Sequence, residues 1–153
     1  MNPEEQRASL RKHYEQSRQS LLSAIEGLSD PDMSLATIDG WSVKDHLTHV
    51  TAWDEIRASE IERISGGGEP AWRPMTEDEV EAFNAMIERM RSSLPLKQVL
   101  AELESSRARV LAAIDAATER GLDETRYGEA GLRSDHEFEH ADIIRRWRER
   151  RSG

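Results

Sequence analysis

The residue types best suited to chemistry in this chain of 153 residues are two pairs of histidines. His136 and His140 stand four residues apart, so on a helix their Cβ atoms would lie about 5–6 Å apart on one face. His46 and His49 stand three residues apart in a second segment that has apolar residues at helical spacing. Two imidazoles on neighbouring turns can bind one metal ion, and a third from another helix completes a three-histidine site with room for water. The two pairs therefore predict a metal centre between two helices.

A packing role is the alternative for these histidines. The pattern His-x-x-x-His is short and also occurs without a metal, and most buried polar groups are paired with nearby protein groups. Inward-facing imidazoles without a shared partner would, however, be costly to desolvate. Asp45 and Glu139 are candidates to orient the histidine rings through hydrogen bonds. Asp45 also fits a helix cap, and Glu139 also fits a solvent-exposed helix face.

Helix-start signals place both histidine pairs on helices. Ser42 fits an N-cap, and Asp45 stands where its carboxylate returns a hydrogen bond to the cap, which is the capping-box pattern. An apolar arc with a spacing of about 100° per residue follows this cap. Its members are Val43, Leu47, Val50 and Trp53. The segment 134–137 repeats the capping-box pattern directly before the second histidine pair, so both pairs are expected near the start of a helix.

Apolar residues recur at helical spacing along almost the whole chain, and no segment alternates with the period of a strand. Five helical segments are predicted: residues 3–28, 42–64, 76 to the break at Pro95, 96–118 and 135–150. The stretches 30–40 and 121–133 are predicted loops. We therefore expect one all-α domain over residues 1–153, with long helices that pack as an antiparallel bundle.

Composition excludes several kinds of function. The chain has no cysteine, which excludes a disulfide, a thiolate metal ligand and a cysteine nucleophile, so any thiol must come from another molecule. Its net charge of −9 argues against binding to nucleic acid. No apolar stretch is long enough to span a membrane, and the charged N-terminal segment lacks the apolar core of a secretory signal. A cytoplasmic location is expected.

The segments GWSVKDHLTHVTAWD and SDHEFEHADIIRRW together resemble the DinB/YfiT-like superfamily, and the first is also similar to the ClbS/DfsB relatives. The resemblance implies a DinB-like four-helix bundle with an accessory helix and a divalent metal ion, typically zinc or nickel. By position in the family pattern, the implied ligands are His49, His136 and His140. His46 stands where the family usually has an aliphatic residue. It could be a fourth ligand, a group that orients a ligand, or a core histidine bonded to a backbone carbonyl.

The same superfamily includes thiol-dependent transferases, among them mycothiol-dependent maleylpyruvate isomerase, and proteins described as metal-dependent hydrolases. The resemblance therefore implies an enzyme acting on a small molecule, either a hydrolase or a transferase that uses an external low-molecular-weight thiol. A bundle that binds a small ligand without catalysis is one alternative, and a structural dimer with packed histidines is another. The expected assembly is a homodimer. No catalytic residue is assigned, and Gly66 to Gly68 lacks the lysine of a phosphate-binding loop.

Overall fold

A computed structural model describes residues 1–152, and the chain is all-α, as the periodicity predicted. Its elements in chain order are α1 (Pro3–Ile25), α2 (Asp30–Ser34), α3 (Val43–Ser65), α4 (Glu77–Arg91), α5 (Leu96–Asp115), the 3-10 helix η1 (Glu124–Arg126) and α6 (His136–Ser152). An isolated β-bridge joins Ile38 to Trp41 just before α3. Within residues 1–152, no helix has the length and apolar character needed to cross a membrane.

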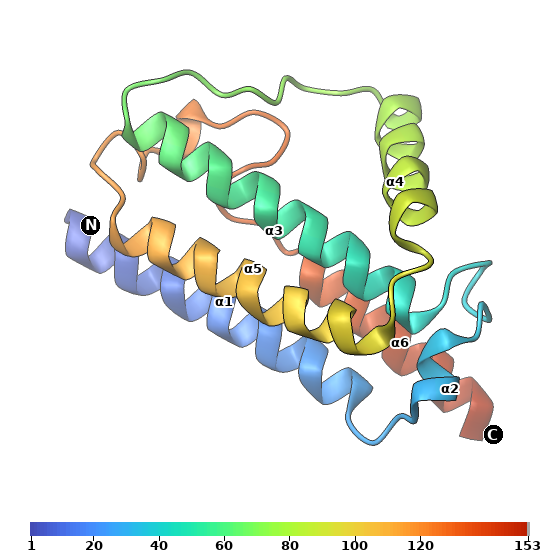
Figure 1. The fold of residues 1–153 in the computed structure, drawn as a ribbon. Coiled ribbons are helices and arrows are strands. Elements are labelled where there is room, and N and C mark those ends of the chain that lie inside the picture. The colour runs from blue at the N-terminus through green and yellow to red at the C-terminus, as the bar shows by residue number, and fades with distance from the viewer. Residues whose placement is uncertain (153) are drawn as a thin grey trace.

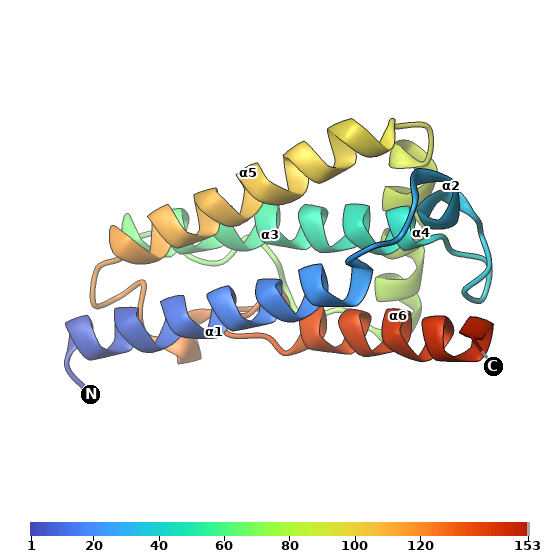
Figure 2. The same cartoon turned by 90° about the horizontal axis from the view of Figure 1, so that it is seen from below.

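Four long helices, α1, α3, α5 and α6, form a bundle, and α4 packs against α3 as an accessory helix (Figure 1). Figures 1 and 2 show that α3 and α5 run in one direction, and that α1 and α6 run in the other. Lys44 at the start of α3 donates to the carbonyl oxygens of Ser92 and Leu94, just before α5, at 2.9 Å each. The predicted antiparallel arrangement therefore does not hold for the neighbouring helices α3 and α5, which run parallel because the loop after α3, together with α4, returns the chain to the end where α3 begins.

The chain between α1 and α3 differs from the loop predicted for residues 30–40. α1 ends at Ile25, before the predicted end, and the short helix α2 begins after Ser29. The Oγ of Ser29 accepts a hydrogen bond from the N–H of Asp32 at 3.2 Å, and the Asp32 carboxylate accepts one from the N–H of Ser29 at 3.4 Å. Pro31 fits this first turn because a proline there gives up no helical hydrogen bond. The residues from Ser29 to Asp32 therefore start the helix α2 shortly after α1 has ended.

The capping box predicted at the start of α3 is confirmed. The Oγ of Ser42 accepts from the N–H of Asp45 at 3.0 Å, and the Asp45 carboxylate accepts from the N–H of Ser42 at 2.9 Å. The box predicted at the start of α6 is wrong. Ser134 Oγ accepts from the N–H of His136 at 3.1 Å, and the carboxylate of Glu137 points inward to two arginines. Hydrogen bonds between charged groups are roughly twice as strong as neutral ones, so Glu137 is held in the core.

Two clusters of buried apolar side chains fill the bundle. The cluster nearer α2 includes Leu21, Val43, Leu47, Val50, Val99, Leu103, Ile144 and Trp147. The cluster toward the other end of α3 includes Leu10, Tyr14, Ala58, Ile61, Val110 and Ile114. Apolar burial contributes about 25 cal/mol per Å², so these two clusters supply the main favourable term in folding.

A layer of buried charges separates the two apolar clusters. It contains one or two residues from each bundle helix, and we call it the ion layer: Arg18, Asp54, Arg57, Arg107 and Glu137. Arg18 lies 2.9 Å from Asp54 and 3.0 Å from Glu137. Arg107 lies 3.0 Å from Asp54 and also pairs with Glu137. The two carboxylates are thus each shared by arginines from α1 and α5, which ties the four helices together at one level.

Replacing Asp54 with Ala should lower the free energy of unfolding by about 3–5 kcal/mol, because it leaves buried guanidinium groups without their counter-charge. Urea denaturation of the two proteins measures this difference. Glu62→Ala is the matched control, since Glu62 pairs with Arg109 on the exposed surface at 3.0 Å, where a pair contributes less than about 1 kcal/mol. Equal effects of the two substitutions would contradict the role given to the ion layer.

Candidate metal centre

The structure brings together the three histidines that the family pattern implied as ligands. His49 lies on α3, and His136 and His140 lie on the first turns of α6. One ring nitrogen from each residue can be chosen so that all three lie within 4.8 Å of one another. The Nε2 atoms of His136 and His140 are 3.2 Å apart. Two nitrogens bound to one tetrahedral zinc ion at about 2.05 Å would be separated by about 3.3 Å, so this spacing suits a shared ion.

His49 is the histidine whose environment most needs a partner. Its side chain is 2% exposed, and neither of its ring nitrogens has a hydrogen-bond partner within residues 1–152. A buried polar atom without a partner costs about 1–3 kcal/mol. A divalent ion bonded to one of these nitrogens would remove part of that cost. The donor set therefore fits a divalent metal ion that accepts imidazole ligands.

Burial keeps the clustered histidines neutral. Burial, with a smaller contribution from the neighbouring imidazoles of His136 and His46, lowers the pKa of His49 to about 3. Burial also lowers the pKa of His46 to about 4, although the charge of Asp45 acts in the opposite direction. The pKa values of His140 and His136 are also lowered, again chiefly by burial. Metal binding requires a neutral imidazole with a free lone pair. Near pH 7 these side chains are therefore already in the form that binds metal.

His46 contacts the centre through another histidine. Its Nδ1 lies 2.7 Å from the Nδ1 of His140, so one of these nitrogens carries the shared proton. If His140 uses Nε2 for a metal, its Nδ1–H donates to His46. Of the three roles left open for His46, the structure therefore supports a group that orients a ligand. The alternative of a bond to a backbone carbonyl is wrong, because the partner is an imidazole.

The residues around the rings divide into packing and capping groups. Trp41 packs at a centroid distance of 5.1 Å from His46 and 5.5 Å from His49, which shields this side of the centre. The Asp45 carboxylate is used by the helix cap, and Glu139 is exposed. Neither carboxylate orients a histidine ring in the structure.

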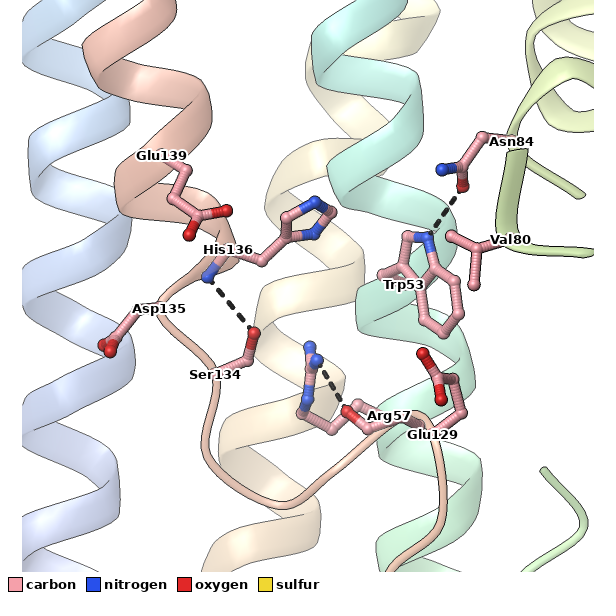
Figure 3. A pocket seen from close by; sticks show the side chains of 10 residues that line it. Trp53, Arg57, Val80, Asn84, Glu129, Ser134, Asp135, His136 and Glu139 are labelled. Carbon is pink, nitrogen blue, oxygen red and sulfur yellow. Dashed lines mark hydrogen bonds between the residues drawn. The ribbon is translucent and has the colours of Figure 1, made fainter. Parts of the chain in front are cut away.

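A cavity of about 310 Å³ opens beside the exposed side of the centre (Figure 3). Its lining comes from α3, α4, the loop before α6 and the start of α6: Trp53, Arg57, Val80, Asn84, Glu129, Ala130, Ser134, Asp135, His136 and Glu139. Trp53 Nε1–H donates to the Oδ1 of Asn84 at 3.3 Å. The volume lies at the lower end of the usual range for ligand pockets, about 300–1,000 Å³. His136 therefore links the histidine cluster to a space large enough for a small molecule.

Comparison with known proteins agrees with this architecture. The sequence pattern of the DinB superfamily matches residues 13–147. The chain belongs to the DinB superfamily. The crystal structure of an uncharacterised protein from Escherichia coli UTI89 is similar over 95% of this chain and 94% of that chain, with a TM-score of 0.77 and 16% sequence identity. At this identity the likeness concerns the fold. A search of curated proteins finds no match.

The buried charged network of Asp54, Arg57 and their partners in the ion layer was not predicted from the sequence. A signal was present, because Asp54 and Arg57 lie in the same helical arc as Val50 and Ile61, where charged residues are unexpected. Arg107 stands in the same way between apolar residues of α5. Charged residues at core positions of several helices together indicate a buried network.

Replacing His46 with Leu should retain a binding site for about one zinc ion per chain but weaken its affinity by about 10- to 100-fold, the usual effect of removing a group that orients a ligand. The substitution replaces the buried imidazole with an apolar side chain of similar size. Competition with a chelating dye measures the affinity. Complete loss of the site would identify His46 as a ligand, and an unchanged affinity would show that the bond to His140 does not orient it.

Proposed function

We propose that this member of the DinB superfamily is a metal-dependent enzyme that acts on a small molecule, with a divalent ion held by His49, His136 and His140. The observation that carries the proposal is the pair of buried, unpaired ring nitrogens of His49. They lie beside two more imidazoles, one of which, His136, lines a cavity. Zinc or nickel suits this donor set.

Three imidazole ligands leave the ion with at least one coordination position for another molecule, which is typical of catalytic rather than structural sites. When bound, such an ion acts as a Lewis acid and can lower the pKa of a bound water from 15.7 to about 7. The protein holds the three imidazoles neutral and shields one side with Trp41. On the other side, His136 borders the cavity, so a small molecule there would be adjacent to the open position.

Two reaction classes fit this arrangement. A hydrolase would use the water, and a transferase would use a thiol in the same position. Because the chain has no cysteine, the thiol of a transferase must be a separate low-molecular-weight compound. No side chain on the cavity wall is assigned as the general acid or base. The homodimer and the cytoplasmic location stay predictions.

Replacing His140 with Ala should abolish both metal binding and metal-dependent turnover, because it removes one of three ligands. Elemental analysis of protein purified without a histidine tag should show about one ion per chain in the unaltered protein, the stoichiometry of a mononuclear site. Turnover is measured with chromogenic esters, and with an electrophile plus an added thiol. His13→Gln is the control, since His13 lies outside the centre and bonds to the carbonyl oxygen of Ser134.

Protein without an ion, whose melting temperature does not change on adding zinc, nickel or a chelator, would contradict the metal proposal. A site that binds an ion at 1,000 times its Kd should stabilise the fold by about 4 kcal/mol. An ion with four protein ligands, and no turnover in either assay, would instead indicate a structural site.

A further inference from the structure

The ion layer carries one more positive charge than negative, and the excess falls on one residue. Three arginines face the two carboxylates of Asp54 and Glu137. Arg18 and Arg107 each contact both carboxylates at hydrogen-bond distance. The Nη1 of Arg57, by contrast, lies 3.8 Å from Asp54 Oδ1, which is beyond hydrogen-bond distance. Arg57 is therefore the arginine whose charge is least compensated.

Backbone groups fix the orientation of Arg57. Its Nε donates to the carbonyl oxygen of Gly131 at 3.3 Å, and its Nη2 donates to that of Ala130 at 2.9 Å. These two bonds leave Nη1 without a hydrogen-bond partner in the part of the chain that the structure describes. The side chain is only 7% exposed. Arg57 is thus held rigidly, so it can bind a further group with little additional loss of side-chain freedom.

The free end of Arg57 faces the cavity beside the metal centre. Arg57 and His136 both line the cavity of about 310 Å³, and both also line a smaller cavity of about 20 Å³ next to the ion layer. Figure 3 shows the guanidinium pointing toward the ring of His136. The shared lining and the direction of the guanidinium place the free charge next to a candidate ligand.

We propose that Arg57 binds an anionic group, a carboxylate or a phosphate, of the small molecule that enters this cavity. A guanidinium presents donors in a planar fork that matches the oxygens of both groups. Its attraction is stronger in this buried position than it would be in water, because the local dielectric constant is lower. This inference rests on the proposed function, because both take the cavity as the substrate pocket. It adds that the substrate is an anion.

Three carboxylates stand on the cavity wall and oppose anions at longer range. Glu129, Asp135 and Glu139 are exposed to solvent, so salt screens their charges over about 8 Å at physiological ionic strength. Figure 3 shows the side chain of Asp135 pointing away from the cavity. A buried arginine is screened much less. The arrangement therefore favours a small anionic group that reaches Arg57.

The test uses acetate and inorganic phosphate as probes on the full-length, metal-free protein, so that neither anion can bind to an ion. Their affinities are measured by titration calorimetry at constant ionic strength, adjusted with chloride. Replacing Arg57 with Gln should weaken binding of at least one probe by about tenfold or more, because a charged hydrogen bond is lost. Arg57→Lys, which keeps the charge but not the fork, should bind with intermediate affinity.

Arg109→Gln is the matched control, since it removes one arginine that pairs with Glu62 on the exposed surface. Its affinity for the probes should equal that of the unaltered protein. A second readout needs no substitution. Trp53 lines the same cavity, so the NMR signal of its indole Nε1–H in the unaltered protein should shift on adding acetate or phosphate. Equal affinities of the Gln variant and the unaltered protein, or a Trp53 signal that neither anion moves, would overturn the proposal.

Failure of this inference and failure of the metal proposal give different results. If the unaltered protein binds anions through Arg57 but takes up no metal, the anion site is supported and the metal centre is contradicted. If the protein takes up one metal ion while the anions bind independently of Arg57, the metal centre is supported and the anion site is contradicted. Metal content of Arg57→Gln should equal that of the unaltered protein, because Arg57 is not a ligand.

Discussion

The buried pairing of two carboxylates with arginines from different helices is the interaction on which the rest of this structure depends. Asp54 on α3 and Glu137 on α6 are each bonded by Arg18 of α1 and Arg107 of α5. Moving one helix along its axis would leave a charge in the core without its partner, at a cost of several kcal/mol. The apolar clusters on either side favour compact packing but tolerate small shifts. The ion layer therefore fixes the relative positions of the four bundle helices.

This constraint also positions the histidines. Glu137 follows His136 directly and precedes His140 by less than one turn, so its bonds to Arg18 and Arg107 tie the first turns of α6 to α1 and α5. The same two arginines bind Asp54 of α3, which links α6 to α3. On α3, Asp54 lies five residues, about 1.4 turns, after His49. The same contacts thus set the spacing between imidazoles from two helices. Arg57 belongs to this layer as well, which connects the electrostatics of the core to the cavity wall.

Several features of the fold and centre could be predicted from the sequence. The capping box of Ser42 and Asp45 depends on residues three apart, and local hydrogen bonds of this kind leave a clear pattern. The spacing of His136 and His140 on one helical face is equally local. The proximity of the second pair is a contact between distant segments, which the presence of histidines on two predicted helices suggested. The choice of His49 as the ligand from that pair came only from resemblance to a family. The structure does bring these three residues together.

Other features depend on interactions between distant residues that no local pattern shows. Glu137 fits a capping box with Ser134, but two arginines far away in the sequence hold its carboxylate in the core. The parallel direction of α3 and α5 depends on the path of α4, which periodicity does not describe. Similarly, the His46–His140 contact requires the two helices to be packed first. In each case, tertiary contact decides between local alternatives of similar energy.

X-ray absorption spectroscopy of protein loaded with one equivalent of zinc tests the central claim most directly. Three imidazole nitrogens and one oxygen of a non-protein ligand such as water are expected at about 2.0–2.1 Å, the geometry of an open zinc site. With His46→Leu, the spectrum should still show three imidazoles. A shell of four imidazoles, or one formed by carboxylate oxygens without histidine scattering, would contradict a centre built from His49, His136 and His140.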